Sequence, residues 1–286
     1  MSSNIVLGLA TRQNLLSLQN INQNIGISQS HLATGLKVAS AVDDAVKFFQ
    51  SQSLLNRAND LSQRKDTIDQ GISSLTNATN ASQSVVSVLQ QLQGILNSAK
   101  TQTAAQRAAA ATQFNSLSKQ LNNLVNDASY QGLNLVNSTA SVLTLQFSVT
   151  STSKLTINGF NEQVSKLVTT HAAATLLATA IVGKKFSTVS NATSVFDKAF
   201  NTLQNAVFQA QADAQALGTN VTFLQTRLDF SSQYIATLQG GSDKLVVADV
   251  NQESTNLVTL QTRQQLAIQS LSIATQSEQA VLRLFH

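Results

Sequence analysis

One apolar stripe between residues 196 and 238 constrains the fold of this chain more than any other feature. Apolar side chains recur there in alternating steps of four and three residues, and only Ser231 interrupts the series. Such heptad spacing is typical of one long helix that lies along other helices. At 1.5 Å per residue this helix would run for roughly 60 Å, which predicts an elongated protein. The stripe consists of Phe196, Phe200, Leu203, Val207, Ala210, Ala214, Leu217, Val221, Leu224, Leu228, Ile235 and Leu238.

The composition supports long helices and excludes several classes of function. The 286 residues include no proline, which would break a helix, and no cysteine, so disulfides and thiolate metal sites are impossible. Charged residues make up only 11% of the chain, and the net charge of +4 is scattered, which argues against nucleic-acid binding. No apolar run approaches the ~20 residues of a membrane span, and the first residues lack the pattern of a secretory signal.

Residues 4–33 predict an amphipathic helix that is too weakly apolar to be stable alone. Its apolar positions are Ile5, Leu9 and Leu16, followed after a slip near residue 17 by Leu18, Ile21, Ile25 and Leu32. Thr34-Gly35 ends this helix, because glycine suits the residue after a helix C-terminus. Residues 36–44 predict a non-helical connector, in which Ser40 and Asp43 resemble a capping box that starts the next helix.

Two further helices follow and predict a small bundle with the helix over residues 196–238. The first reaches about Ser98, and the second begins after a break near Lys100–Thr103. The seam of the first contains Leu61, Ile68, Ile72, Leu75, Thr79, Val86, Leu89 and Leu96. One face of the second contains Leu117, Leu121, Leu124 and Ala128.

The middle of the chain changes period. Residues 130–135 (YQGLNL) break the helical pattern, and two alternating apolar runs across a polar turn then predict a β-hairpin. The inward positions are Leu143, Leu145, Phe147 and Val149, then Leu155 and Ile157. We expect a short helix over Val164–Val182 and a flexible joint at Gly240-Gly241-Ser242. A closing helix then carries Val250, Leu257, Leu260, Ala267, Leu271, Ala274, Val281 and Phe285, with Gln264 and Glu278 as polar gaps.

Nothing in the sequence predicts a catalytic or cofactor site. His31, His171 and His286 have no second ligand at metal spacing, and Gly183-Lys184-Lys185 lacks the remainder of a phosphate-binding loop. Asp43 and Asp44 suit a cap and connector better than acid–base chemistry. We therefore expect no enzyme activity, no metal and no cofactor.

Three motifs in this order resemble bacterial flagellin over nearly the whole chain. They are HLATGLKVASAVDDA at residues 31–45, YQGLNL at residues 130–135, and the segment from Ala248 to Phe285. The resemblance implies a mainly α fold, an elongated helical bundle with N- and C-terminal coiled-coil helices, a β-hairpin and a small variable insert. Residues 1–42 with 239–286 would form an inner coiled coil that lines a channel. Residues 43–135 with 191–238 would form the bundle of an outer tube, and residues 136–190 the hairpin and a reduced outer region.

The resemblance also implies a function. The chain would be a structural subunit that self-assembles into the extracellular flagellar filament for motility, after export through the flagellar type III apparatus. Its partners would be copies of itself, the export machinery, an export chaperone, and cap and hook-associated proteins, without nucleic acid or membrane insertion. A flagellar hook–filament junction protein is the alternative, which the YQGLNL motif and the short middle disfavour. An enzyme or soluble binding domain is a more distant third.

The resemblance assigns three groups of residues. The inner coiled coil would assemble through Leu18, Ile21, Ile25, Leu32, Val250, Leu257, Leu260, Leu271, Val281 and Phe285. The bundle seam would contain Leu61, Ile68, Leu75, Leu89, Phe200, Leu203, Leu217 and Leu224. In many flagellins the stretch matching residues 89–98 carries arginine and glutamate where the innate flagellin receptor docks. This chain has Gln91, Gln93 and Gly94 there, which predicts weak docking, because glutamine lacks the charge of arginine.

Overall fold

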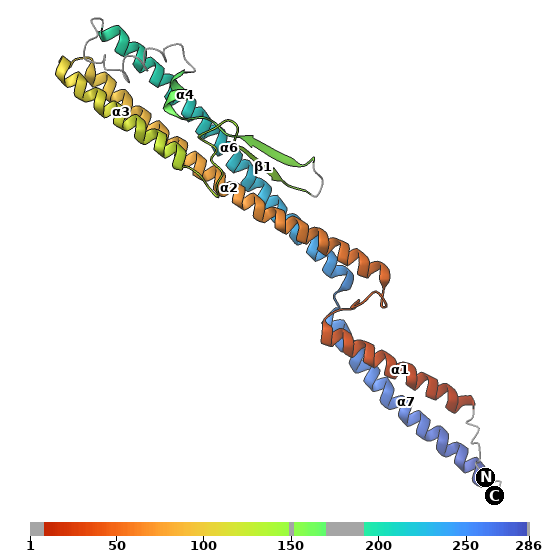
Figure 1. The fold of residues 1–286 in the computed structure, drawn as a ribbon. Helices are drawn as coiled ribbons and strands as arrows, with labels where there is room; N and C mark the ends of the chain where they lie inside the picture. The colour runs from red at the N-terminus through yellow and green to blue at the C-terminus, as the bar shows by residue number, and fades with distance from the viewer. Residues whose placement is uncertain (1–8, 149–151, 170–191, 285–286) are drawn as a thin grey trace. The chain divides into compact units, whose positions relative to one another are not determined.

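The computed structural model describes residues 9–148, 152–169 and 192–284, and these are mainly helical (Figure 1). The predicted mainly α fold with one hairpin is confirmed. The chain divides into two compact units: Met1–Ala58 with Ala236–His286, here the terminal unit, and Asn59–Ile235, here the bundle unit. The boundaries between these two units fall inside long helices, whereas the domain boundaries that the resemblance implies lie at residues 42 and 239. The elements are α1 (Leu9–Thr34), α2 (Ala45–Ala99), α3 (Ala104–Asp127), β1 (Val142–Gln146), β2 (Lys154–Asn158), α4 (Val164–Thr169), α6 (Ala192–Val246) and α7 (Val250–Leu284).

The core of the bundle unit lies between α2, α3 and α6. Most of the predicted seam is buried, namely Leu61, Ile68, Leu75, Leu89, Leu203, Leu217 and Leu224. Phe200 is only half-buried, and the Lys100 ammonium lies 5.5 Å from the centre of its ring. On α3 the buried line is Ala110, Phe114, Leu121 and Val125, whereas the predicted Leu117, Leu124 and Ala128 are half-buried at its edge.

The start of α2 differs from the prediction. The Asp43 carboxylate does accept hydrogen bonds from the backbone N–H and hydroxyl of Ser40, at 2.9 and 3.1 Å, but this pair closes a turn before the helix. The helix begins at Ala45, and its cap is Asp44, whose Oδ1 accepts from the Lys47 backbone N–H at 3.0 Å. These contacts to ionised oxygens lower the pKa of both aspartates. The later break at residues 100–103 is present as predicted.

The predicted joint at Gly240-Gly241-Ser242 is wrong, because α6 continues through it to Val246. Packing within the terminal unit explains the difference. Ser242 is fully buried and hydrogen bonds to Ser51 with 2.8 Å between the hydroxyl oxygens, and a Cβ on Gly241 would lie 3.5 Å from Leu54 Cδ1. Tertiary contacts therefore outweigh the low helix propensity of two glycines. The chain leaves the helix only at residues 247–249.

The hairpin forms as predicted and packs on α2. Leu143 pairs with Ile157 and Leu145 with Leu155 in an antiparallel register. Position 71 of α2 is a glycine, and a Cβ added there would lie only 2.5 Å from Leu145 Cδ1. The hairpin can therefore approach α2 closely, because Gly71 has no side chain. Val149 lies outside the described residues, as does most of the expected helix over 164–182, of which α4 covers Val164–Thr169.

The YQGLNL segment makes the turn that leads from α3 to the hairpin. Gln131 and Gly132 have positive φ angles of 50° and 82°, and Tyr130 and Leu133 exchange backbone hydrogen bonds across them. The buried Asn134 amide donates to the Val125 carbonyl at 2.7 Å, and its side-chain oxygen accepts from the Val136 N–H at 2.9 Å.

Within the described ranges, no helix has the length and apolar character to cross a membrane.

The two interior glycines of α2 provide a matched test of hairpin docking. We expect Gly71→Ala to lower the free energy of unfolding by about 1–2 kcal/mol, because the buried Leu145 must move to admit the methyl group. Gly94→Ala has open space around the new Cβ. It should raise that free energy by roughly 0.5–1 kcal/mol, as expected for replacing glycine within a helix. Denaturant unfolding of both variants is the measurement, and equal effects would contradict this docking.

Candidate assembly surface

In the terminal unit, α1 and α7 lie side by side and run antiparallel (Figure 1). They face each other along one line of buried and half-buried residues. Each line keeps the heptad alternation of three and four residues. The α1 line is Thr11, Asn14, Leu18, Ile21, Ile25, Ser28 and Leu32. The α7 line is Glu253, Leu257, Leu260, Gln264, Ala267, Leu271 and Ala274. The predicted coil residues Leu18, Ile21, Ile25, Leu32, Leu257, Leu260 and Leu271 all lie on these lines.

Some predicted apolar positions of the first helix, and some predicted members of the coil, do not lie on these lines. Leu9, Leu16 and Val250 are exposed. The predicted slip near residue 17 is absent: the heptad that contains Leu18 continues backwards through Asn14 and Thr11, which are polar and therefore gave no apolar signal. The side chain of Val281 and the whole of Phe285 lie outside the described part of the chain.

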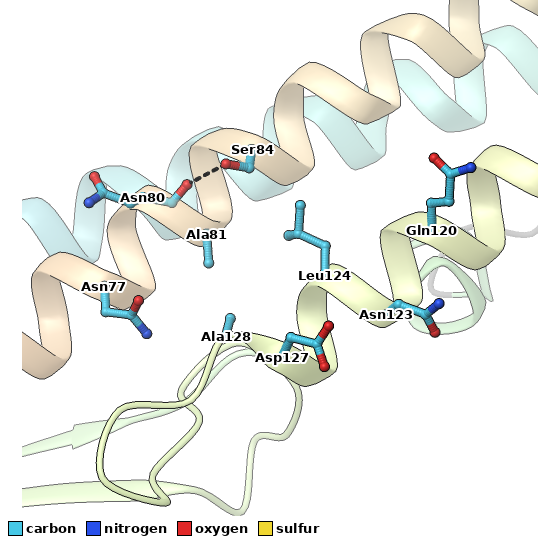
Figure 2. Close-up of a pocket in the computed structure, with 9 residues that line it drawn as sticks. All are labelled: Asn77, Asn80, Ala81, Ser84, Gln120, Asn123, Leu124, Asp127 and Ala128. Carbon is cyan, nitrogen blue, oxygen red and sulfur yellow. Dashed lines mark hydrogen bonds between the residues drawn. The ribbon is translucent and has the colours of Figure 1, made fainter.

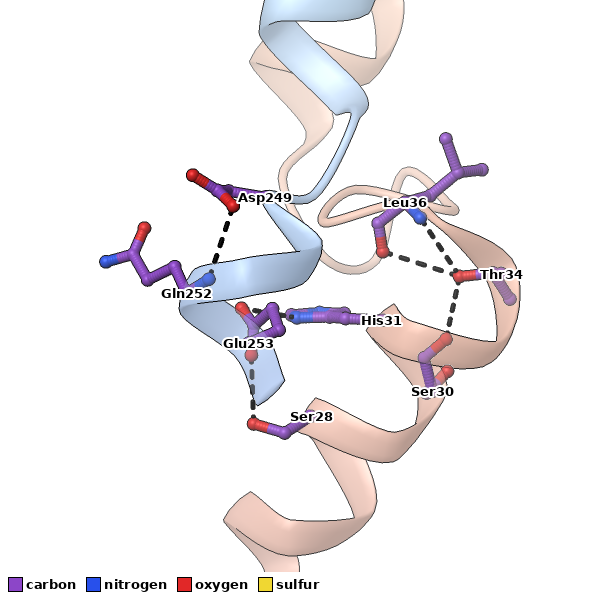
Figure 3. A network of polar contacts seen from close by, with 8 residues as sticks. All are labelled: Ser28, Ser30, His31, Thr34, Leu36, Asp249, Gln252 and Glu253. Atoms are coloured by element: carbon purple, nitrogen blue, oxygen red, sulfur yellow. Dashed lines mark hydrogen bonds and ion pairs between the residues drawn. The ribbon is translucent and has the colours of Figure 1, made fainter. Parts of the chain in front are cut away.

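Polar contacts replace apolar ones at several points of this α1–α7 seam. Glu253 accepts from Ser28 Oγ at 3.0 Å, and its other oxygen lies 3.2 Å from His31 Nδ1 (Figure 3). Further along, the Gln264 amide donates to Asn22 Oδ1 at 2.7 Å. Partial burial disfavours the charge on Glu253, but the hydrogen bonds from His31 and Ser28 and the His31 charge outweigh it and lower the pKa of Glu253.

The two connectors that flank this pair are held together by backbone hydrogen bonds. Gly35, at φ +70°, ends α1, and its N–H donates to the His31 carbonyl at 2.8 Å. Beyond it, the Lys37 N–H donates to the Val246 carbonyl at 2.7 Å, and the Ala248 N–H to the Gly35 carbonyl at 2.9 Å. Sequence reasoning missed this pairing, because backbone groups leave no signal in side-chain pattern.

The outer faces of the terminal unit are unusually apolar. Of the 17 exposed large apolar residues among those described, 13 belong to this unit and only four to the bundle unit. The 13 are Leu9, Leu15, Leu16, Ile27, Val42, Val46, Phe49, Val247, Val250, Val258, Leu266, Ile268 and Ile273. Exposed apolar surface gathered in one region marks an interaction site rather than a solvated face.

A groove lies in the bundle unit, between α2 and α3. Asn77, Asn80, Ser84, Gln120, Asn123 and Asp127 rim it, over an apolar floor (Figure 2). It holds one carboxylate among amides, and across the described residues no three potential metal ligands come together.

The structure separates the three residues predicted to face a receptor. Gln91 and Gly94 are exposed on α2. Gln93 is buried, and its amide donates to Gln204 Oε1 on α6 at 2.9 Å, which corrects its predicted place on the surface. Its spacing on the helix puts it beside the buried Leu92 and Leu96 rather than beside Gln91.

Comparisons with known proteins agree with this arrangement. Residues 5–141 match the family model described as the bacterial flagellin N-terminal helical region. Flagellin FljN of Caulobacter vibrioides is 30% identical, and flagellin FljO of the same organism is 28% identical, each over 95% of both chains. A solved structure from Vibrio parahaemolyticus, described as a flagellar hook-associated protein, has a TM-score of 0.61 over 72% of this chain and 100% of its own, at 13% identity. That likeness shows the fold alone.

The matches over nearly the whole chain define a structural protein that assembles with copies of itself. The chain belongs to the bacterial flagellin family. It is a subunit of the flagellar filament, a homopolymer that lies outside the cell.

The Glu253 cluster predicts that acid weakens the α1–α7 pair. Because folding lowers the pKa of Glu253, its contribution to stability is present above about pH 4.5 and is lost as the pH falls through the lower value in the folded protein. We expect amide-exchange protection in α1 to fall more steeply with acid in the wild type than in Glu253→Gln. Asp243→Asn, an exposed change in the same unit, serves as control and should keep the wild-type profile. Identical profiles for wild type and Glu253→Gln would contradict the role of this cluster.

Proposed function

We propose that subunits assemble through the exposed apolar faces of α1 and α7, while the seam between these two helices holds each pair together. The proposal is supported by the 17 exposed large apolar residues among those described, of which nine lie on α1 and α7 and four more lie elsewhere in the terminal unit. Burying one such side chain fully against a neighbour stabilises the assembly by about 1.5–3 kcal/mol. Several contacts of this size per subunit suffice to drive polymerisation.

The polar seam complements the apolar outside. Within one subunit, the α1–α7 pair buries Thr11, Asn14, Ser28 and Gln264 at least partly, which limits its hydrophobic gain. A pair of low stability gains most from neighbours, because binding to the folded form shifts the folding equilibrium toward it. We infer that the terminal helices become fully stable only in the polymer, so that free subunits remain unassembled at low concentration.

The remaining features of the function follow from family membership. We infer that the chain is exported through the flagellar type III apparatus with an export chaperone, and that it meets cap and hook-associated proteins at the filament ends. The paired terminal helices would line the filament channel, the bundle unit would form the outer tube, and the hairpin region would face outward. We infer from family membership that the role is structural rather than enzymatic.

Two adjacent residues of α7 separate assembly from folding. Leu266 and Gln265 are both exposed, and we expect Leu266→Asp to prevent seeded filament growth, since a carboxylate at an apolar contact lacks a partner. Gln265→Asp should assemble, and both variants should keep the wild-type helix content as monomers by circular dichroism. Leu257→Asp, inside the α1–α7 seam, should lose both helix content and assembly. Filaments of normal length from Leu266→Asp would overturn the proposal.

We further propose that the exposed surface at Gln91 and Gly94 docks the innate flagellin receptor weakly. The family resemblance places an arginine at residue 91, and arginine at an interface centre is often worth about 2 kcal/mol, or roughly thirtyfold in affinity. We expect Gln91→Arg to lower the monomer concentration for half-maximal receptor signalling about thirtyfold in a cell reporter assay. Gln90→Arg, an exposed neighbour on the same helix, is the matched control and should not. Full signalling by wild-type monomer at nanomolar concentration would refute weak docking.

A further inference from the structure

A fully buried carboxyl group lies where the chain returns from the hairpin to the bundle. Glu162 follows β2 and is anchored by its backbone N–H, which donates to the Val136 carbonyl at 2.9 Å. Its Oε1 accepts from the Ser82 hydroxyl of α2 at 2.6 Å. The second oxygen, Oε2, is buried and has no hydrogen-bond partner among the described residues. Such an arrangement suits a neutral acid far better than an anion.

Among the described residues, the elements around Glu162 contribute no buried lysine, arginine or histidine. α2 carries no charged residue between positions 70 and 99, and α6 carries only Asp213 between positions 199 and 226. Asp213 is itself buried, and its hydrogen bond comes from Gln209 on the same helix, at 2.8 Å. The charged residues of α3 and α4 nearest along the chain, Lys119, Asp127 and Lys166, are exposed. In the described part of the chain, two buried acids therefore lie in the bundle unit without a buried cation.

This environment changes the protonation of both acids in the same direction. Burial raises the pKa of Glu162 to about 8, against the opposing bond from Ser82, and the Asp213 charge raises it further. Burial also raises the pKa of Asp213, against the bond from Gln209. At neutral pH the Glu162 carboxyl is therefore mostly protonated.

We propose that Glu162 is a proton-dependent latch, which holds the segment 161–169 on the bundle while its carboxyl is neutral and releases that segment when the carboxyl ionises. Other contacts also hold the segment. Leu167 and Val164 pack on the core, and Asn161 forms an isolated bridge with Asn137. The Val164 N–H donates to Asn122 Oδ1 at 3.1 Å, and the Gln163 amide donates to Asn126 Oδ1 at 3.2 Å. A buried Glu162 carboxylate with one unpaired oxygen opposes these contacts directly.

The direction of the pH effect follows from linkage. A glutamate in the unfolded chain titrates near 4.5, so folding takes up a proton at any pH between about 4.5 and 8. Over that window the Glu162 contribution raises the unfolding equilibrium constant about tenfold per pH unit, and it levels off above pH 8. This behaviour is opposite to that of Glu253, whose contribution is lost in acid. The latch does not depend on the mode of filament assembly proposed above.

The chain itself simplifies the first test, because it contains only three glutamates, at positions 162, 253 and 278. We would label glutamate with ¹³C at the side-chain carboxyl and titrate the full-length monomer by NMR. One signal should titrate near pH 8 and disappear in Glu162→Gln. Asp213→Asn, which removes the second acid without changing its shape, should move that midpoint to lower pH. If all three signals titrate below pH 6, or if Asp213→Asn leaves the midpoint unchanged, the proposed pairing of buried acids is overturned.

A second measurement tests the release itself. The Leu167 amide donates to the Gln163 carbonyl at 3.0 Å, so its hydrogen-exchange protection factor reports on segment 161–169. We expect this factor, corrected for intrinsic exchange, to fall at least tenfold between pH 6.5 and 9.5 in the wild type, and to stay constant in Glu162→Gln. Protection that does not change with pH in the wild type would overturn the latch, even if Glu162 titrates near 8. The wild-type titration and exchange remain decisive if Glu162→Gln fails to fold.

Discussion

The burial of one uncharged seam between α2 and α6 is the constraint on which the other parts of the bundle unit depend. Leu75, Leu89, Leu203, Leu217 and Leu224 on these helices are fully buried, and the facing stretches carry almost no charge. Because the seam is apolar and long, α3, the hairpin and the return segment can each attach by a short contact of their own. Leu145 over Gly71 is one such contact, and Glu162 on Ser82 is another.

The terminal unit follows a different balance of polar and apolar contact. Its internal seam includes Glu253 paired with Ser28 and His31, whereas its outside carries most of the exposed large apolar residues. Polar groups inside a helix pair specify alignment more than they add stability, and apolar groups outside favour association. In the proposed mode of assembly, contacts between subunits would supply stability that the pair of helices lacks within one subunit.

Periodicity predicted the long helices, the break before α3 and the hairpin, because each depends on which side chains alternate toward a core. The failures have equally physical reasons. Two glycines at 240 and 241 indicated a joint, but Leu54 and the buried pair Ser51 and Ser242 hold them in a helix. The prediction was wrong for the N-terminal part of the α1 seam, because the residues that face α7 there, Thr11 and Asn14, are polar. No sequence pattern predicted the burial of Glu162, because it lies in the irregular stretch between β2 and α4, which has no helical or strand periodicity.

The connector pairing has a consequence for how this protein can vary. Its hydrogen bonds join the N–H groups of Lys37, Val38 and Ala248 to the carbonyls of Val246 and Gly35, so they depend on backbone and not on side-chain identity. Substitutions at these three donor positions therefore leave the backbone hydrogen bonds possible, with one exception. Proline has no backbone N–H and would remove one of these hydrogen bonds. The chain contains no proline, so it avoids the one residue that would break this pairing of the connectors.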